Sequence, residues 1–117
     1  MIPLHGSRKI LIATQPVDFR RGINGLTALV ADALKEQPYR GDVFLFRAKR
    51  SDRLKILVWD GSGMVLATKW LEEGRFTWPP IRDGAMRLTA EQFWILVAGL
   101  DWTRVPERPV RQPLRIA

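Results

Sequence analysis

The chain has 117 residues, which suffices for one domain with a single packed core and leaves no room for a second, catalytic domain. Nineteen Lys and Arg against twelve Asp and Glu give a formal net charge of +7, which predicts attraction to polyanions. The absence of cysteine excludes disulfides and thiolate metal sites and fits a reducing cytoplasm. No apolar stretch has the length of a membrane span or a signal-peptide core, so we expect a cytoplasmic protein without membrane contact.

The first third of the chain predicts a strand followed by a helix. Ile10 to Ala13 is a short apolar run that closes at Pro16. Apolar residues then recur at helical spacing over 19–34, and Asp18 stands where an N-cap is expected. Two glycines in the first turns favour a close contact or a late start of this helix, which should end before Pro38.

Three further segments predict two consecutive hairpins. Residues 42–46 and 54–60 are rich in Val, Ile, Phe and Trp, and the basic stretch 47–53 joins them. A third strand over 64–71 follows Asp-Gly-Ser-Gly, and Asp-Gly between apolar runs is a strong hairpin signal. We therefore expect neighbouring antiparallel strands, the first pair of which ends in a charged tip.

A second helix is predicted over 90–98. Thr89 and Gln92 have the spacing of a capping box, and Gly99 stands where helices commonly end. Together with the other elements, this predicts an α+β fold. Its small, mainly antiparallel sheet is expected to carry the two helices on one face.

The densest positive charge lies at the tip of the first predicted hairpin. Five cations stand there against a single aspartate: Arg47, Lys49, Arg50, Arg53 and Lys55. Long cationic side chains that fan out from a rigid two-stranded stem can reach several phosphates at once. The alternative is a solvated loop whose charges merely protect a sheet edge from aggregation. Both interpretations are open at this point.

The second hairpin divides its side chains between two faces of the sheet. One face is uniformly apolar and is expected to form the core, while the other combines Lys55 with Trp59 and Trp70, as a base-stacking platform would. The alternative is that both tryptophans pack under a helix or across a dimer interface, because large aromatic side chains are usually buried. A homo-oligomer is thus left open.

The sequence offers no catalytic or metal-binding constellation. The single histidine, His5, has no cysteine partner, and the aspartates stand mostly at predicted caps and turns, where local hydrogen bonding explains them. No glycine-rich phosphate loop of the P-loop or dinucleotide type is present. We therefore expect a protein that is not an enzyme and needs no metal or cofactor.

A box at 18–26, Asp-Phe-Arg-Arg-Gly-Ile-Asn-Gly-Leu, resembles the Asp-Met-Arg-x-Gly-x-x-Gly-Leu box of the TnpB accessory proteins of insertion-sequence-66 type transposable elements. The resemblance extends over much of the chain, through 41–46, 55–63 and 69–79. The sequence departs from the family pattern at three places: Phe19 replaces a methionine, Trp70 replaces an arginine, and Arg47-Ala48 stands where an asparagine is common.

The resemblance implies an accessory protein of transposition, while a separate transposase cuts and joins the DNA strands. The expected partners are DNA, at the ends of the element, and the transposase of the same element. Arg20 and Arg21 in the box could hold phosphates or a partner's carboxylates, or could simply be solvated. Two other functions are open: a protein-interaction module that docks the transposase without touching nucleic acid, and an RNA-binding regulator of the element.

Residues 106–117 are rich in proline and arginine and offer few apolar side chains to bury, so we expect a single domain at 1–105 and a flexible basic tail. Deletion of 106–117 should leave the cooperative thermal unfolding transition intact, as followed by circular dichroism. Nucleic-acid binding should weaken only in part, because the basic hairpin stays. If the transition disappears, the tail belongs to the folded domain.

Overall fold

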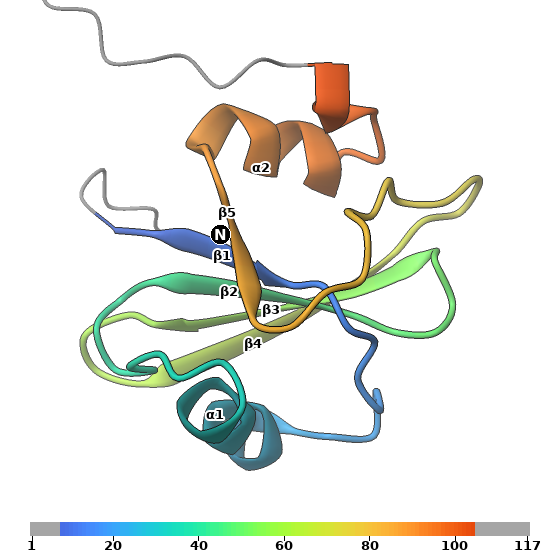
Figure 1. The fold of residues 1–117 in the computed structure, drawn as a ribbon. Helices are drawn as coiled ribbons and strands as arrows, with labels where there is room; N and C mark the ends of the chain where they lie inside the picture. Colours follow the sequence, from blue (N-terminus) through green and yellow to red (C-terminus); the bar gives the residue numbers. More distant parts are fainter. Residues whose placement is uncertain (1–7, 105–117) are drawn as a thin grey trace, which may run out of the picture.

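The computed structural model describes residues 8–104, so the predicted tail and His5 lie outside the described residues. Within that range the elements are β1 (Ile10–Ala13), α1 (Ile23–Asp32), β2 (Val43–Arg47), β3 (Arg53–Trp59), β4 (Met64–Trp70), β5 (Ala85–Leu88), α2 (Ala90–Val97) and a 3-10 turn at Trp102–Arg104 (Figure 1). The strand order is β4-β3-β2-β1-β5, and only the β1–β2 pair among these is parallel. The predicted α+β fold with a mainly antiparallel sheet is confirmed.

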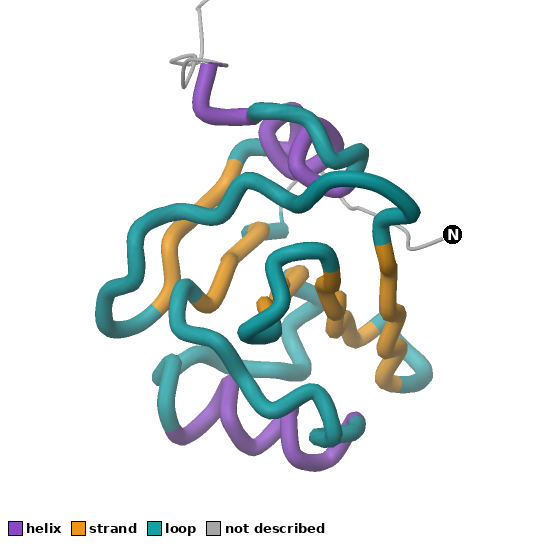
Figure 2. The backbone as a smooth tube through the Cα atoms, turned by 90° about the vertical axis from the view of Figure 1, so that its right-hand side faces the viewer, coloured by secondary structure: helices purple, strands orange, loops and turns teal. Residues whose placement is uncertain are grey.

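The two helices cover opposite faces of the sheet, as both views of the backbone show (Figure 1 and Figure 2). Helix α2 buries Phe93 and Leu96 in one apolar cluster, whereas α1 buries Leu26 and Val30 in another. The expectation that both helices pack on one face was therefore wrong. The reason is that residues 43–46 of central strand β2 are all buried, and alternating side chains of such a strand need cover on both faces.

The parallel pairing of β1 with β2 brings together two loops that are distant in sequence. The pair runs in register from Ile10 opposite Val43 to Ala13 opposite Phe46. Parallel strands require a crossover connection, which here contains α1. Because parallel strands have their carboxyl ends on the same side of the sheet, the segments that follow them, 14–22 and 48–52, become neighbours.

Helix α1 begins late, at Ile23, with Gly22 as its N-cap and no side-chain cap. Asp18 instead accepts a hydrogen bond from the backbone N–H of Arg20 at 2.9 Å, which is a local turn that competes with helix. The predicted capping role of Asp18 was therefore wrong, whereas the late start and the end before Pro38 are confirmed.

Both predicted hairpins are confirmed. Strands β2 and β3 pair across the basic loop 48–52, and β3 and β4 pair in register from Trp59 opposite Met64 to Arg53 opposite Trp70. In the second turn, the Asp60 carboxylate accepts the N–H groups of the two residues that close the loop, and these hydrogen bonds lower the pKa of Asp60. The φ angle of +104° at Gly61 explains the glycine in the Asp-Gly pair.

The capping box of α2 is confirmed in both directions. The Thr89 hydroxyl accepts the N–H of Gln92 at 3.0 Å, and the Gln92 side chain accepts the N–H of Thr89 at 2.9 Å. Gly99 follows the end of the helix and has a φ angle of +80°, the left-handed conformation in which glycine commonly ends helices. Local sequence signals therefore set both ends of α2.

Replacement of Thr89 by alanine should lower the free energy of unfolding by about 1 kcal/mol, because it removes the side-chain cap of α2. The matched control is Thr27→Ala: the Thr27 hydroxyl bonds the Ile23 carbonyl inside α1, where alanine is a better helix former and stability should hold or rise slightly. Urea unfolding measures both variants. An equal loss in the two would contradict the assignment of the cap.

Candidate nucleic-acid interface

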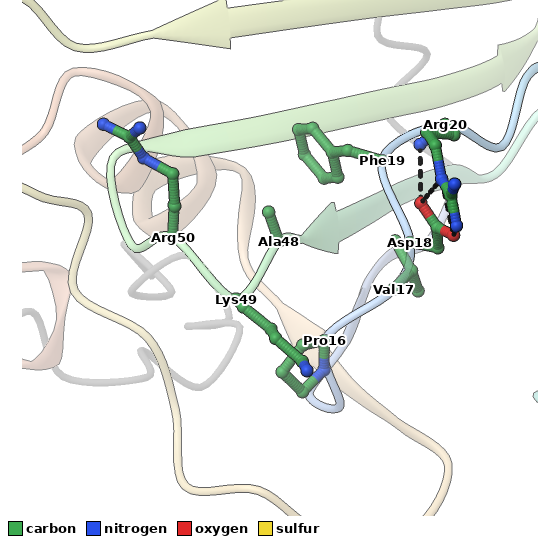
Figure 3. A pocket seen from close by; sticks show the side chains of 8 residues that line it. All are labelled: Pro16, Val17, Asp18, Phe19, Arg20, Ala48, Lys49 and Arg50. Atoms are coloured by element: carbon green, nitrogen blue, oxygen red, sulfur yellow. Dashed lines mark hydrogen bonds and ion pairs between the residues drawn. The ribbon is translucent and has the colours of Figure 1, made fainter.

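A depression of about 430 Å³ lies where the segments after β1 and β2 meet. Eight residues line it: Pro16, Val17, Asp18, Phe19, Arg20, Ala48, Lys49 and Arg50. In Figure 3 the Phe19 ring lies between Arg50 on one side and the Asp18–Arg20 pair on the other, and Lys49 extends on the side of Pro16. We call this feature the basic pocket.

Lys55 holds one wall of the basic pocket against the sheet. Its side chain is buried, and its ammonium group donates hydrogen bonds to the carbonyl of Phe19 at 2.5 Å and to that of Arg21 at 3.1 Å. The same nitrogen lies 4.8 Å from the centroid of the Phe19 ring. The Val17 N–H also donates to the Arg47 carbonyl at 2.8 Å, which ties the crossover segment to the end of β2.

The structure therefore separates Lys55 from the other predicted phosphate contacts. Lys55 points to the sheet face that α1 and the crossover segment cover, and its hydrogen-bond donors face backbone carbonyls rather than solvent. The sequence showed its alternation with Leu57 and Trp59 correctly, but not the cover over that face. Lys55 is a positioning residue for the pocket.

Three exposed cations surround the basic pocket, and two of them are held by neighbouring acids. The Arg20 guanidinium pairs with the Asp18 carboxylate at 2.7 Å, and that of Arg50 pairs with Asp52 at 3.2 Å. Lys49 forms no ion pair within residues 8–104, and neither does the exposed Arg21 beside the pocket. The acids thus restrain the arginines while leaving a net positive rim.

The ion pairs also set the charge state of the acids. Hydrogen bonds from the Arg20 side chain and backbone lower the pKa of Asp18 to about 2, and a hydrogen bond from Arg50 lowers the pKa of Asp52. A carboxylate with a lowered folded-state pKa stabilises the fold above its ordinary value of about 3.9, and this contribution is lost as the pH falls below that value. Both acids are therefore ionised at neutral pH.

The remaining two cations of the hairpin, Arg47 and Arg53, lie over tryptophan rings. The Arg47 guanidinium is 5.2 Å from the centroid of Trp78, and that of Arg53 is 3.8 Å from the centroid of Trp70. Partial burial lowers the pKa of Arg47, although an arginine remains charged under all physiological conditions. These contacts make the two arginines less accessible than Lys49 and Arg50.

The two predicted stacking tryptophans lie in different environments. Trp59 is half-buried and packs edge-on against Tyr39, with 5.5 Å between the ring centroids. Trp70 is 61% exposed at the outer strand of the sheet, and one face of its ring carries Arg53. Lys55, Trp59 and Trp70 therefore do not form one open platform, although they do share a face of the hairpin, as predicted.

The segment after β4 braces the basic loop, and sequence reasoning missed this role. The Ser51 carbonyl accepts hydrogen bonds from the Phe76 N–H at 2.8 Å and from the Trp78 indole at 3.3 Å. The Leu71 N–H donates to the Asp52 carbonyl at 3.0 Å. Two aromatics in a proline-rich passage were the only signal that this segment packs against the rest of the fold.

Within residues 8–104, no three side chains of His, Cys, Asp or Glu come close enough to hold a metal ion. Asp101 takes part in a local hydrogen bond from the Thr103 N–H, whereas Asp83 accepts one from the side chain of the sequence-distant Gln15. No helix in the same range has the length and apolar character to cross a membrane.

The fold and the site define a small basic α+β protein with cations gathered at one edge of its sheet. Residues 8–107 match the model of the IS66 Orf2-like proteins, and the chain belongs to this family, which makes it a transposition-associated accessory protein. It is 61% identical over 115 residues to the uncharacterised protein y4jC of Sinorhizobium fredii, covering 98% of this chain and 97% of the relative. A second protein of that organism, y4hO, is 36% identical over 113 residues, or 95% and 98% of the two chains. No solved structure matches.

Replacement of Lys55 by methionine should lower the free energy of unfolding by about 1–3 kcal/mol, because two carbonyls of the crossover segment lose their donor. The matched control is Lys49→Met, which changes an exposed side chain and should shift stability by no more than about 0.5 kcal/mol. Urea unfolding gives the stabilities, and trypsin cleavage after Arg20 and Arg21 reports release of the segment. Equal behaviour of the two variants would contradict the positioning role of Lys55.

Proposed function

We propose that the protein binds DNA through the basic pocket and the adjoining loop, as an accessory factor that acts beside the transposase of an IS66-type element. One observation carries the proposal: Arg20 and the pair Lys49–Arg50, far apart in sequence, converge on one depression. Convergence of cations from two loops suits a ligand with repeated negative charges, such as a nucleic-acid backbone.

The individual side chains suit phosphate contacts. Arg20 uses Nε and Nη2 for Asp18, so the Nη1 group forms no hydrogen bond within the described residues and can donate to a phosphate oxygen. Lys49 and Arg21 are exposed and unpaired in the same range. Arg47 and Arg53 would act as secondary contacts, since stacking on tryptophan restricts their reach.

This role requires no chemistry from the protein itself. Phosphate contacts position a protein on DNA without reading its sequence, so the basic pocket alone supports general affinity. Sequence preference for element ends would then come from the transposase, and the accessory protein would help to assemble or orient that enzyme there. Trp70, with its exposed ring, is a further contact for an unpaired base.

A second function, docking on the transposase without nucleic acid, is favoured by a different observation. Asp18 and Asp52 already pair with two of the pocket's arginines, so the surface has mixed charge, as many protein-binding surfaces do. An acidic face of the transposase would then replace the phosphates. RNA binding, as a regulator of the element, would use the same cations and is distinguished only by the choice of ligand.

Replacement of Lys49 and Arg50 together by alanine should flatten the salt dependence of duplex DNA binding. If the four exposed cations Arg20, Arg21, Lys49 and Arg50 each neutralise one phosphate, the logarithm of the affinity falls against the logarithm of salt with a slope of about −4. The double variant should reduce the magnitude of this slope by about two. It should also weaken binding to element-end DNA and to scrambled DNA to a similar extent. Fluorescence anisotropy over a salt titration measures it.

The matched control is the double variant Arg40→Ala with Arg87→Ala, which removes the same charge from exposed positions outside the pocket and should leave most of the slope. Single-stranded DNA and RNA of equal length are titrated in parallel to identify the preferred nucleic acid. If a pocket variant binds all nucleic acids like the parent but no longer associates with the transposase, the pocket is a docking site for the transposase and not a DNA-binding site.

A further inference from the structure

We propose that two copies of this protein join through the outer strand β4 and form one continuous sheet across both molecules. Strand β4 is an edge of the sheet in the described part of the chain, and it spans seven residues, Met64–Trp70. An edge strand presents a row of unpaired backbone donors and acceptors to whatever strand can align with them. Figure 2 shows the two edge strands at opposite sides of the molecule.

The backbone groups of β4 that face outward can be identified from the hydrogen bonds at its two ends. The Asp60 N–H donates to the Gly63 carbonyl at 3.0 Å, and the Leu71 N–H donates to the Asp52 carbonyl at 3.0 Å. Hydrogen-bonded pairs alternate along an antiparallel ladder, so the odd-numbered residues of β4 bond β3. The even-numbered ones present their N–H and C=O groups at the free edge: Met64, Leu66, Thr68 and Trp70.

This pattern is self-complementary about Ala67. When two β4 strands run antiparallel with Ala67 opposite Ala67, Met64 stands opposite Trp70 and Leu66 opposite Thr68. The pairs Met64–Trp70 and Leu66–Thr68 join residues whose backbone groups face outward, and Ala67–Ala67 is a non-hydrogen-bonded pair between them, so the full length of both strands can pair without an unmatched group. Alternation requires that even-numbered residues pair with even-numbered ones, and among such registers the one centred on Ala67 pairs the whole of Met64–Trp70.

The side chains suit the same register. Directly opposite residues of an antiparallel pair share a face, so the exposed Trp70 ring of one copy would cover the partly buried Met64 of the other. The two-fold symmetry gives this contact at both ends of the junction. Lys69 of one copy stands opposite Val65 of the other, which keeps the two lysines apart. No like charges meet across the junction.

The edge also lacks the devices that usually prevent such pairing. Strand β4 contains no proline, and its one charged residue, Lys69, donates from its ammonium group to the Val97 carbonyl of α2 at 2.6 Å. The ammonium is thus held by its own molecule rather than projecting from the edge. The opposite edge, β5, is only four residues long and carries the exposed Arg87.

Such a dimer would carry two copies of the proposed DNA-binding pocket, but the proposal of the dimer does not depend on DNA binding. The basic loop precedes β3 and lies beside the Trp70 end of β4. Antiparallel pairing of two β4 strands therefore places the two basic pockets toward opposite ends of the joined strands, related by a two-fold axis. The tests below contain no nucleic acid, so a failure of dimerisation and a failure of DNA binding are separately visible.

The first test measures the molar mass of the full chain by sedimentation equilibrium, from low micromolar to submillimolar concentration. The parent should form dimers. Thr68→Pro should shift it to monomer, because this proline removes only a donor that faces the free edge and no bond to β3. Thr68→Ala keeps the donor and should dimerise. Circular dichroism confirms that each variant is folded, and a monomeric parent throughout this range overturns the proposal.

The second test uses the absence of native cysteine and does not require a disruptive variant. Ala67→Cys places one thiol of each copy on the two-fold axis, at a non-hydrogen-bonded pair, where the close approach of the strands permits a disulfide. Under mild oxidation at low concentration, this variant should form a covalent dimer rapidly. Ser62→Cys, at the exposed turn beyond the strand, should not. Faster cross-linking through position 62 overturns the proposed register.

Discussion

The ammonium group of Lys55 is the contact on which the site depends. It reaches from β3 to two carbonyls of the crossover segment and ties that segment to the sheet. Without it, the Val17 N–H bond to the Arg47 carbonyl would tie the segment only at one point, and the wall of the basic pocket that Phe19 and Arg20 form would be held less firmly. A buried lysine can do this because its donors are satisfied by backbone carbonyls rather than by a second charge.

The crossover imposes the second constraint. Pairing β1 with β2 in parallel requires a long connection, and α1 in that connection covers one face of the sheet while α2 covers the other. The two loops that follow the parallel strands must then leave the sheet on the same side, at the carboxyl ends of these strands. The convergence of Arg20 with Lys49 and Arg50 is therefore a consequence of topology, and the acids Asp18 and Asp52 hold two of these cations in place.

Membership of the IS66 Orf2-like family and the distribution of charge point in the same direction. An accessory protein that acts beside a transposase needs surfaces for partners rather than a catalytic cluster. The described residues offer two such surfaces: a basic pocket suited to phosphates and an unpaired sheet edge suited to a second copy. The cations that line the pocket are not part of β4, whereas Trp70 belongs to β4 and would serve either an unpaired base or the second copy.

The sequence alone determined the elements whose signals are local. The capping box of Thr89, the Asp-Gly turn after Trp59 and the alternation of β3 and β4 each depend on a few neighbouring residues, and all appear in the structure. Tertiary structure alone decided which face each helix covers and where Lys55 points. Alternation assigns side chains to faces but carries no information about what covers a face, because that depends on a crossover whose ends are distant in sequence. The charge of the hairpin was thus readable from the chain, while its division into buried, stacked and exposed cations was not.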